Sequence, residues 1–238
     1  MPDVIFEEIE CKSAVHRVSQ ASARTMPFRW TLNPYRGCQH ACTYCFARAT
    51  HEHLGYDAGR DFETRIIVKV NAPEMLRQDL GRASWQRELI AIGTACDPYQ
   101  AAELKYSLTH RILKVLRDFA NPTSIVTKSP HVVRDVDVLE ELSAVADTTV
   151  SFSVSTLDDD VWKRIEPATA KPSRRLEAMR VLSERGIRCG VMLAPVLPGL
   201  TDDAASLEAV VEAAREHGAS FIHDNVLYLK PGTKEWFM

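Results

Sequence analysis

From residue 66 onward the sequence alternates short apolar runs with longer amphipathic segments, and this rhythm restricts the possible folds more than any other feature. Buried strands are predicted from the length and β-branched content of six runs: 66–70, 89–93, 124–127, 149–155, 187–195 and 221–229. Strands that alternate with helices imply right-handed crossovers and a parallel sheet. With one more strand ending at Pro34, about six strand and helix units fit the chain.

The amphipathic segments between these runs predict the helices. The longest covers 104–119, where apolar residues recur at helical spacing. Other helices are expected over 138–145, from the acidic run 158–160, through 176–186, and over 203–218. The pattern predicts an α/β protein, and it fits an open or partial barrel as well as a doubly wound sheet.

Length and composition are those of an ordinary globular protein. Of the 238 residues, 45% are hydrophobic and 26% are charged, with a formal net charge of -3, and one domain is the default at this length. The first ten residues, MPDVIFEEIE, lack the basic start and apolar run of a signal peptide. The apolar run 190–197 is too short to cross a bilayer. We therefore expect a cytoplasmic protein without a membrane segment.

Three of the six cysteines stand together in CQHACTYC, at residues 38–45. Cys38, Cys42 and Cys45 have the spacing C-x3-C-x2-C and follow the strand that ends at Pro34, where the sites of parallel α/β folds lie. In a reducing compartment, clustered thiols indicate a metal or catalysis rather than disulfides. The scattered Cys11 and Cys189 are expected to be small buried residues.

Thiolates suit both zinc and iron-sulfur clusters, so two metal sites are possible. A structural zinc site needs a fourth protein ligand, and His40, His51 and His53 are the nearest candidates. That site would make the chain a zinc-stabilised module that binds nucleic acid or protein. A cubane cluster held by three cysteines leaves one iron open for a substrate or cofactor, and the chemistry favours this alternative.

Charge is distributed unevenly near the amino terminus. Residues 2–10 contain four acids, whereas residues 11–48 contain no acid and six basic residues: Lys12, Arg17, Arg24, Arg29, Arg36 and Arg48. Such a basic segment is able to meet the phosphates of a nucleic acid or of a cofactor, or to form a solvated face. The slightly acidic chain as a whole is unlike a dedicated nucleic-acid binder.

Five blocks of sequence, in order, resemble the radical S-adenosylmethionine superfamily and, within it, the spore photoproduct lyase-like branch, often described as DNA repair photolyase-related. They are NPYRGCQHACTYCFAR (33–48), GTACDPYQAAE (93–103), TKSPHVVRDVD (127–137), RIEPATAKPSRRLEAMRVLSERGI (164–187) and LAPVLPGLTDD (193–203). The resemblance runs over nearly the whole chain and includes the aromatic residue before the third cysteine of the motif.

The resemblance implies a partial (β/α)6 TIM-like barrel with parallel strands, outer helices and the cluster loop after the first strand. Cys38, Cys42 and Cys45 would hold a [4Fe-4S] cluster whose open iron binds S-adenosylmethionine. An electron donor such as flavodoxin or ferredoxin would drive cleavage to a 5′-deoxyadenosyl radical, which abstracts hydrogen from the substrate. The resemblance thus implies a lyase-like radical enzyme, and damaged DNA is the first guess for its unassigned substrate. A cluster-bearing electron carrier is a third possibility, which would not need the cofactor positions.

Those cofactor positions are carried over from the family residue by residue. Tyr44 would lie beside the adenine, while Gly93 and Thr94 would receive the methionine amino group, with the missing side chain of Gly93 permitting close approach. Ser153 and Ser155 would contact the ribose and carboxylate. Ser153 and Ser155 share one face of their predicted strand, so partners in the neighbouring backbone are the alternative.

Three further residues carry less certain roles in the resemblance. Lys128 ends a predicted strand and would meet a carboxylate, or else lie on the surface. Arg175 would pair either with Glu166 or with the cofactor carboxylate. Cys96 stands where a small hydroxyl residue is expected, and it would be a hydrogen donor to the substrate or a packing residue.

The same resemblance suggests how the chain is divided. Residues 1–28 are expected to form an N-terminal extension and residues 29–230 the radical S-adenosylmethionine barrel core. Residues 231–238 are expected to begin a C-terminal segment that is truncated, since Thr233 suits a helix cap and only one turn follows it.

Overall fold

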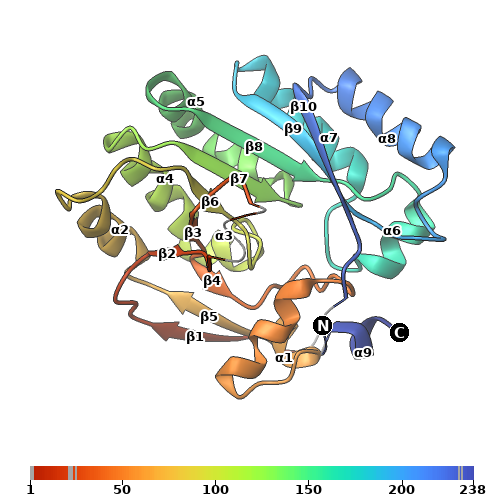
Figure 1. The fold of residues 1–238 in the computed structure, drawn as a ribbon, viewed down its shortest axis with the longest axis horizontal. Coiled ribbons are helices and arrows are strands. Elements are labelled where there is room, and N and C mark those ends of the chain that lie inside the picture. The colour runs from red at the N-terminus through yellow and green to blue at the C-terminus, as the bar shows by residue number, and fades with distance from the viewer. Residues whose placement is uncertain (1–2, 21–23, 25, 230, 232) are drawn as a thin grey trace.

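A computed structural model describes residues 3–20, 24, 26–229, 231 and 233–238. Its larger sheet has seven strands in the order β10-β9-β8-β7-β6-β3-β2 (Figure 1). They are β2 (Val15–Arg17), β3 (Trp30–Leu32), β6 (Ile90–Ile92), β7 (Thr123–Thr127), β8 (Thr148–Ser153), β9 (Arg188–Val196) and β10 (Phe221–Val226). All neighbours from β3 to β10 are parallel, and β2 is antiparallel to β3. The expected partial barrel of six parallel strands is confirmed for the described residues.

Helices cover the outside of this curved sheet (Figure 1). The longer ones are α2 (Ala72–Leu80), α4 (Leu108–Asp118), α5 (Val136–Val145), α7 (Pro172–Glu184) and α8 (Ala204–Glu216). Each turns an apolar stripe inward, as Leu116 of α4, Leu142 of α5 and Leu182 of α7 illustrate with 0% exposure. Complete burial of one such side chain stabilises the fold by roughly 1.5–3 kcal/mol.

Shorter elements carry the connections. Four brief helices are α1 (Arg60–Thr64), α3 (Ala102–Tyr106), α6 (Asp159–Ile165) and α9 (Thr233–Phe237). The 3-10 turns with described bounds are η2 (Phe46–Thr50), η3 (Glu52–Leu54) and η4 (Pro130–Asp135). The Asp158 side chain accepts the backbone N–H groups of Asp160 and Val161, which explains why α6 begins where the acidic run predicted.

The strand predicted at 66–70 forms, but it does not belong to the barrel. It is β5 (Arg65–Lys69), the middle strand of a separate sheet, parallel to β1 (Ile5–Ile9) and antiparallel to β4 (Tyr35–Arg36). An apolar run specifies a buried strand without specifying its neighbours. The first strand of the chain therefore lies beside a strand some sixty residues later.

The single helix predicted over 104–119 is wrong in one respect, since the chain breaks at Ser107 into α3 and α4. Ser107 has a φ of 50°, which interrupts the helical ladder. The buried Glu103 carboxylate accepts the backbone N–H groups of Thr109 at 3.0 Å and His110 at 3.3 Å, and so caps α4. Apolar periodicity continues across the break and does not reveal it.

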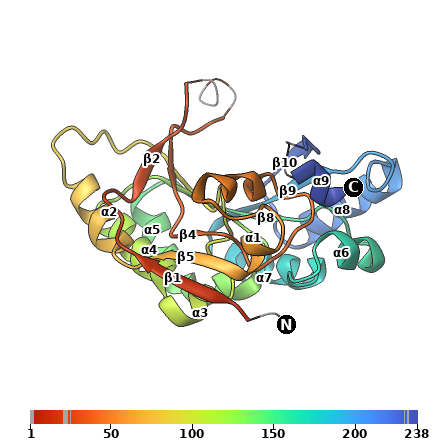
Figure 2. The same ribbon diagram turned by 90° about the horizontal axis from the view of Figure 1, so that it is seen from below.

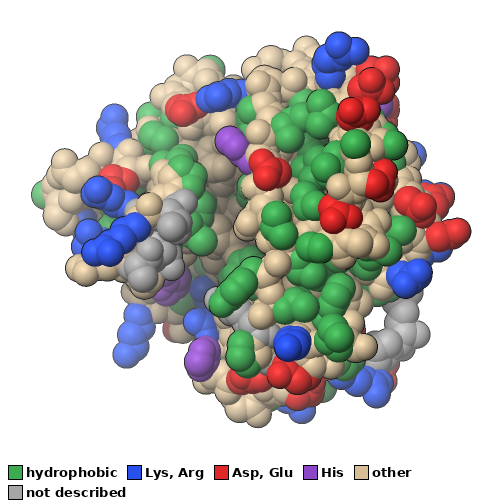
Figure 3. Space-filling view, turned by 45° about the vertical axis from the view of Figure 1, so that its right-hand side comes forward, with side chains coloured by type: hydrophobic (Ala, Val, Ile, Leu, Met, Phe, Trp, Pro, Cys, Tyr) green, Lys and Arg blue, Asp and Glu red, His purple; other side chains and the backbone are tan. Residues whose placement is uncertain are grey.

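Strand β2, at the edge of the larger sheet and antiparallel to β3, rises from the body of the molecule (Figure 2). The space-filling view shows a deep hollow, with hydrophobic side chains gathered along one side and Lys and Arg side chains along the other (Figure 3). In the described part of the chain, no helix has both the length and the apolar character needed to cross a bilayer.

Candidate active site

The cysteine loop, residues 37–45, is shaped by polar residues outside it. All three of its cysteines are free thiols, Cys38 and Cys42 being buried and Cys45 half-buried. The Gln100 side chain donates to the Gly37 carbonyl at 3.1 Å and accepts the Gln39 N–H at 3.0 Å. Gly37 has a φ of 80°, and a Cβ there would lie 2.7 Å from a backbone oxygen, so only glycine fits.

Arg48 fixes the other end of the loop. Its guanidinium is fully buried, its Nε donates to the Cys42 carbonyl at 2.8 Å, and it pairs with Glu63. The guanidinium carbon lies 5.3 Å from the ring centroid of Phe62 and 5.1 Å from that of Trp236. One member of the basic segment is thus engaged in contacts within the protein interior.

Helix α9 also contacts this loop. The Thr233 hydroxyl donates to the Cys45 carbonyl at 3.2 Å, and Trp236 of the same helix stacks on Arg48. The last described residues therefore pack against the cysteine loop.

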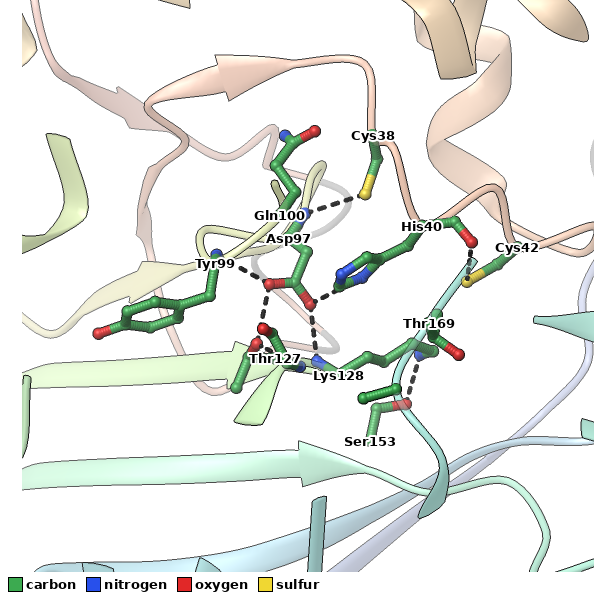
Figure 4. Close-up of polar contacts among 12 residues, drawn as sticks. Cys38, His40, Cys42, Asp97, Tyr99, Gln100, Thr127, Lys128, Ser153 and Thr169 are labelled. Atoms are coloured by element: carbon green, nitrogen blue, oxygen red, sulfur yellow. Dashed lines mark hydrogen bonds and ion pairs between the residues drawn. The ribbon is translucent and has the colours of Figure 1, made fainter. Parts of the chain in front are cut away.

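Asp97 connects the loop to the ends of the barrel strands (Figure 4). Its backbone N–H donates to the sulfur of Cys38 at 3.5 Å. Its carboxylate accepts three hydrogen bonds: from Tyr99 N at 2.9 Å, Thr127 Oγ1 at 2.8 Å and Lys128 N at 2.6 Å. The His40 ring nitrogen Nδ1 is 3.3 Å from the same carboxylate. Burial alone would raise the pKa of Asp97, but His40 and the hydrogen-bond donors outweigh it and lower the pKa to about 2.

A second set of contacts forms the Glu166 cluster, which comprises Tyr44, Lys128, Ser153, Ser155, Glu166 and Arg175. Within it, Lys128 Nζ donates to Ser153 Oγ at 2.6 Å and lies 3.7 Å from the Glu166 carboxylate. The Tyr44 hydroxyl donates to Glu166 and lies 3.5 Å from Ser155 Oγ. Burial acts to raise the pKa of Glu166, yet Lys128, Arg175 and the Tyr44 hydrogen bond lower it. The carboxylate is thereby held ionised in the interior.

Arg175 uses its donors within the protein. It pairs with Glu166, and it donates to Ser153 O at 2.8 Å, Ala170 O at 2.9 Å and Thr169 Oγ1 at 2.6 Å. Arg175 is thus paired with Glu166, which is one of the two partners that the sequence suggested. Lys128 differs because its side chain is 15% exposed and retains donor capacity.

The end of β6 brings together the remaining predicted residues. Gly93 has a φ of 89°, and a Cβ would lie 2.3 Å from the Val126 carbonyl oxygen, so packing alone requires glycine there. Asn33 donates to Thr94 Oγ1 at 3.1 Å, and its own Oδ1 is 3.9 Å from the Cys96 sulfur. Burial raises the pKa of the Cys96 thiol to about 12, so this thiol keeps its proton at neutral pH.

Sequence reasoning singled out the members of the Glu166 cluster, and His40 only as a candidate zinc ligand, but it did not identify Asn33 and Asp97. Asn33, His40 and Asp97 each bridge two parts of the site, and their polar side chains lie inside the quoted blocks. In the sequence, Asn33 and His40 stand near the cysteine motif and Asp97 directly follows Cys96, and these positions were the available signal. Which backbone groups they meet depends on how β3, β6 and β7 are placed side by side.

The thiols suit a cluster better than a single metal ion. A zinc ion would need all its ligand sulfurs about 2.3 Å from one point. In the part of the chain that the structure describes, no three His, Cys, Asp or Glu side chains are arranged to hold one ion. An iron-sulfur cluster binds each thiolate through a different iron, and a backbone N–H donor to a ligand sulfur, as Asp97 provides for Cys38, suits it well.

Comparisons with known proteins agree with this arrangement. Residues 32–214 match the family model described as the Radical SAM superfamily. An uncharacterized protein of Mycobacterium tuberculosis is 40% identical over 235 residues, covering 99% of this chain and 68% of the relative. An uncharacterized protein of Methanocaldococcus jannaschii is 29% identical over 174 residues, covering 73% and 62%.

Among solved structures, the fold is similar to that of spore photoproduct lyase. The complex with dinucleoside spore photoproduct has a TM-score of 0.73 at 16% identity, covering 98% of this chain and 65% of that one. A double mutant with bound AdoMet and dinucleoside spore photoproduct has a TM-score of 0.69 at 16% identity, covering 90% and 61%. The chain thus spans somewhat less than two thirds of the length of these structures.

Proposed function

Because the chain belongs to the radical S-adenosylmethionine superfamily and is an enzyme, we propose that it cleaves S-adenosylmethionine reductively at a [4Fe-4S] cluster and abstracts hydrogen from a substrate. The observation that carries the proposal is the loop of three free thiols at the end of a parallel barrel, beside a buried cluster of charges. Cys38, Cys42 and Cys45 would hold the cluster, which supplies the electron for cleavage of the sulfonium.

The other residues of the site would bind and orient S-adenosylmethionine and exclude water from it. Lys128 is the cation that retains donor capacity, so it would meet the carboxylate of S-adenosylmethionine. Ser153 accepts a hydrogen bond from the Lys128 ammonium group and so fixes its position. Arg175 acts as a positioning residue because it holds Glu166 and the backbone of Ser153. Tyr44 has its hydroxyl anchored at Glu166, which orients the ring as one wall of the cofactor site.

At the end of β6, Thr94 would receive the methionine amino group, and the backbone turn at Gly93 sets the position of Thr94. Ser155 would contribute a hydroxyl toward the ribose. Cys96 is buried beside Asn33 with its proton retained, and this supports its proposed role as hydrogen donor to a substrate radical. Damaged DNA is the proposed substrate, supported by the likeness to spore photoproduct lyase complexed with dinucleoside spore photoproduct. A flavodoxin or ferredoxin would supply the electron.

The test is anaerobic reconstitution with iron and sulfide, followed by S-adenosylmethionine and dithionite and measurement of 5′-deoxyadenosine. We expect product from the native chain and from Cys189→Ala, which removes a buried cysteine outside the loop. We expect none when Cys38, Cys42 and Cys45 are all replaced by Ala. A colourless protein with one tightly held zinc and no product would replace this proposal with the zinc-stabilised binding module. Ultraviolet-treated DNA is the first substrate to add.

A further inference from the structure

A second cavity, of about 240 Å³, lies where the small sheet meets β2. Basic side chains from four parts of the chain line it: Lys12, His16, Arg36 and Lys69. We call it the basic pocket. Lys12 follows β1, His16 lies on β2, Arg36 on β4 and Lys69 on β5, so the pocket is assembled by the fold and not by one charged run.

No carboxylate is paired with these cations in the described part of the chain. Lys69 is 6% exposed, and its ammonium donates to the Asn33 carbonyl oxygen at 2.9 Å, which is a neutral acceptor. The acid whose charge reaches His16 is Asp79. Asp79 is committed elsewhere, because it accepts Ser13 Oγ and the Ala14 N–H, each at 2.8 Å, and pairs with Arg82.

The positive charges gathered here affect the pKa values of His16 and Lys69. Burial lowers the pKa of His16, and Lys69 and Arg36 lower it further against the opposing charge of Asp79. Burial also lowers the pKa of Lys69, with Arg36 acting in the same direction. Like charges held together in a partly buried site are unfavourable unless an anion joins them. The pocket is therefore a site of positive potential with space for an anion.

The basic pocket and the candidate active site share Asn33. Its backbone carbonyl receives the ammonium of Lys69, and its side chain contacts Thr94, the Ala95 N–H and the Cys96 thiol. Asn33 thus links Lys69 of the pocket to Cys96, the proposed hydrogen donor.

We propose that the basic pocket binds a phosphodiester group of the substrate and so holds a nucleotide chain beside Cys96. The assignment of this phosphate to the substrate rests on the function proposed above. Arg36 is suited to the role because a guanidinium donates two parallel hydrogen bonds to phosphate, and Lys69 adds a fixed charge at the floor. Two other members of the basic segment, Arg48 and Arg29, are paired with carboxylates instead.

The test measures binding of thymidylyl-thymidine to the anaerobically reconstituted full chain by calorimetry at low salt. The uncharged methylphosphonate analogue and inorganic phosphate are the comparison probes. Arg36→Gln changes an exposed lining residue, and Arg17→Gln is the matched control on β2, outside the pocket. Lys12→Gln is a second lining variant, also at an exposed position.

We expect thymidylyl-thymidine to bind, with at least about tenfold loss for the analogue and for Arg36→Gln and less than about twofold for Arg17→Gln. Equal binding of the analogue, equal losses in the two arginine variants, or binding of inorganic phosphate without the dinucleotide would overturn the assignment. Formation of 5′-deoxyadenosine is scored separately on the same preparation. Dinucleotide binding without 5′-deoxyadenosine would support the phosphate site and exclude the proposed function. Formation of 5′-deoxyadenosine without dinucleotide binding would support the proposed function and exclude the phosphate site.

Discussion

Two regions of this molecule bring basic side chains together, and they balance the positive charge in opposite ways. In the Glu166 cluster, Lys128 and Arg175 surround one buried carboxylate. In the basic pocket, Lys69 and Arg36 stand together without a paired carboxylate among the described residues. Glu166 supplies a counter-charge for the first pair of cations, and Lys128 keeps donor capacity beside it. The second pair has no such acid among the described residues, so an anionic ligand would supply the missing counter-charge.

The largest effect on stability is expected from Glu166→Gln, which leaves Lys128 and Arg175 buried without their counter-charge. We expect a loss of about 3–5 kcal/mol in the free energy of unfolding, because removal of one partner strands the others in the interior. Chemical denaturation measures it. Glu177→Gln is the control, since that residue pairs with Arg180 on the surface and should change stability by less than about 1 kcal/mol. Similar losses in both variants would contradict the distinction between the buried charges of the Glu166 cluster and a surface ion pair.

Removal of a cation from the same cluster should affect binding more than folding. Lys128→Met leaves Glu166 paired with Arg175, so we expect a smaller stability loss than for Glu166→Gln. Binding of S-adenosylmethionine to the reconstituted protein should weaken at least about tenfold, as expected for loss of a charge-assisted hydrogen bond. Lys171→Met, which removes an exposed lysine paired with Asp159, should leave affinity unchanged. Unchanged affinity in Lys128→Met would exclude its proposed contact with the cofactor.

Salt concentration also distinguishes the two regions. Dinucleotide binding at the basic pocket should weaken roughly threefold between about 50 and 200 mM salt, because a single phosphate contact releases counterions. The stability difference between the native chain and Glu166→Gln should hardly change, since buried pairs are screened little. Calorimetry and denaturation across a salt series provide both numbers. A salt-independent dinucleotide affinity would show that Arg36 and Lys69 do not act through charge.

The smallest expected effect is in the pH dependence of stability, where each region has its own window. The pKa of His16 is lowered from 6.5, chiefly by burial, so its contribution is present above pH 6.5 and is lost as the pH falls below it. The pKa of Glu166 is lowered from 4.5 because Lys128 and Arg175 outweigh the effect of burial, so its contribution is lost only below pH 4.5. His16→Gln should flatten the upper window and Glu166→Gln the lower one in denaturation curves. If both variants removed the pH dependence of stability in the same pH range, the assignment of one range to His16 and the other to Glu166 would be refuted.

Much of the barrel was predictable, because parallel strands and amphipathic helices leave a periodic record in the sequence. Runs such as 124–127 and 187–195 form barrel strands β7 and β9 close to their predicted bounds. The partner of β5 was not predictable, since its apolar run is like those of the barrel strands. The break at Ser107 depends on the buried Glu103, which leaves no periodic signal.

The site was predictable as a set of chemical types and not as a network. The cysteine motif and the residues matching the family motifs were identified, and their roles remain predictions. The contact between Lys128 and Glu166 joins residues from two blocks that are far apart in the sequence, and only the fold brings them together. The basic segment illustrates the same limit, because its members share a composition but Arg48 is interior and Arg36 lines a cavity.

The stacking of Trp236 on Arg48 gives the cysteine loop an optical reporter. The guanidinium that faces this indole also holds the Cys42 carbonyl, and Thr233 of the same helix holds that of Cys45. A shift of the loop therefore changes the surroundings of one aromatic ring. Binding of the proposed cluster by the loop would therefore be expected to change the emission of one of the chain's four tryptophans, with no label attached to the protein.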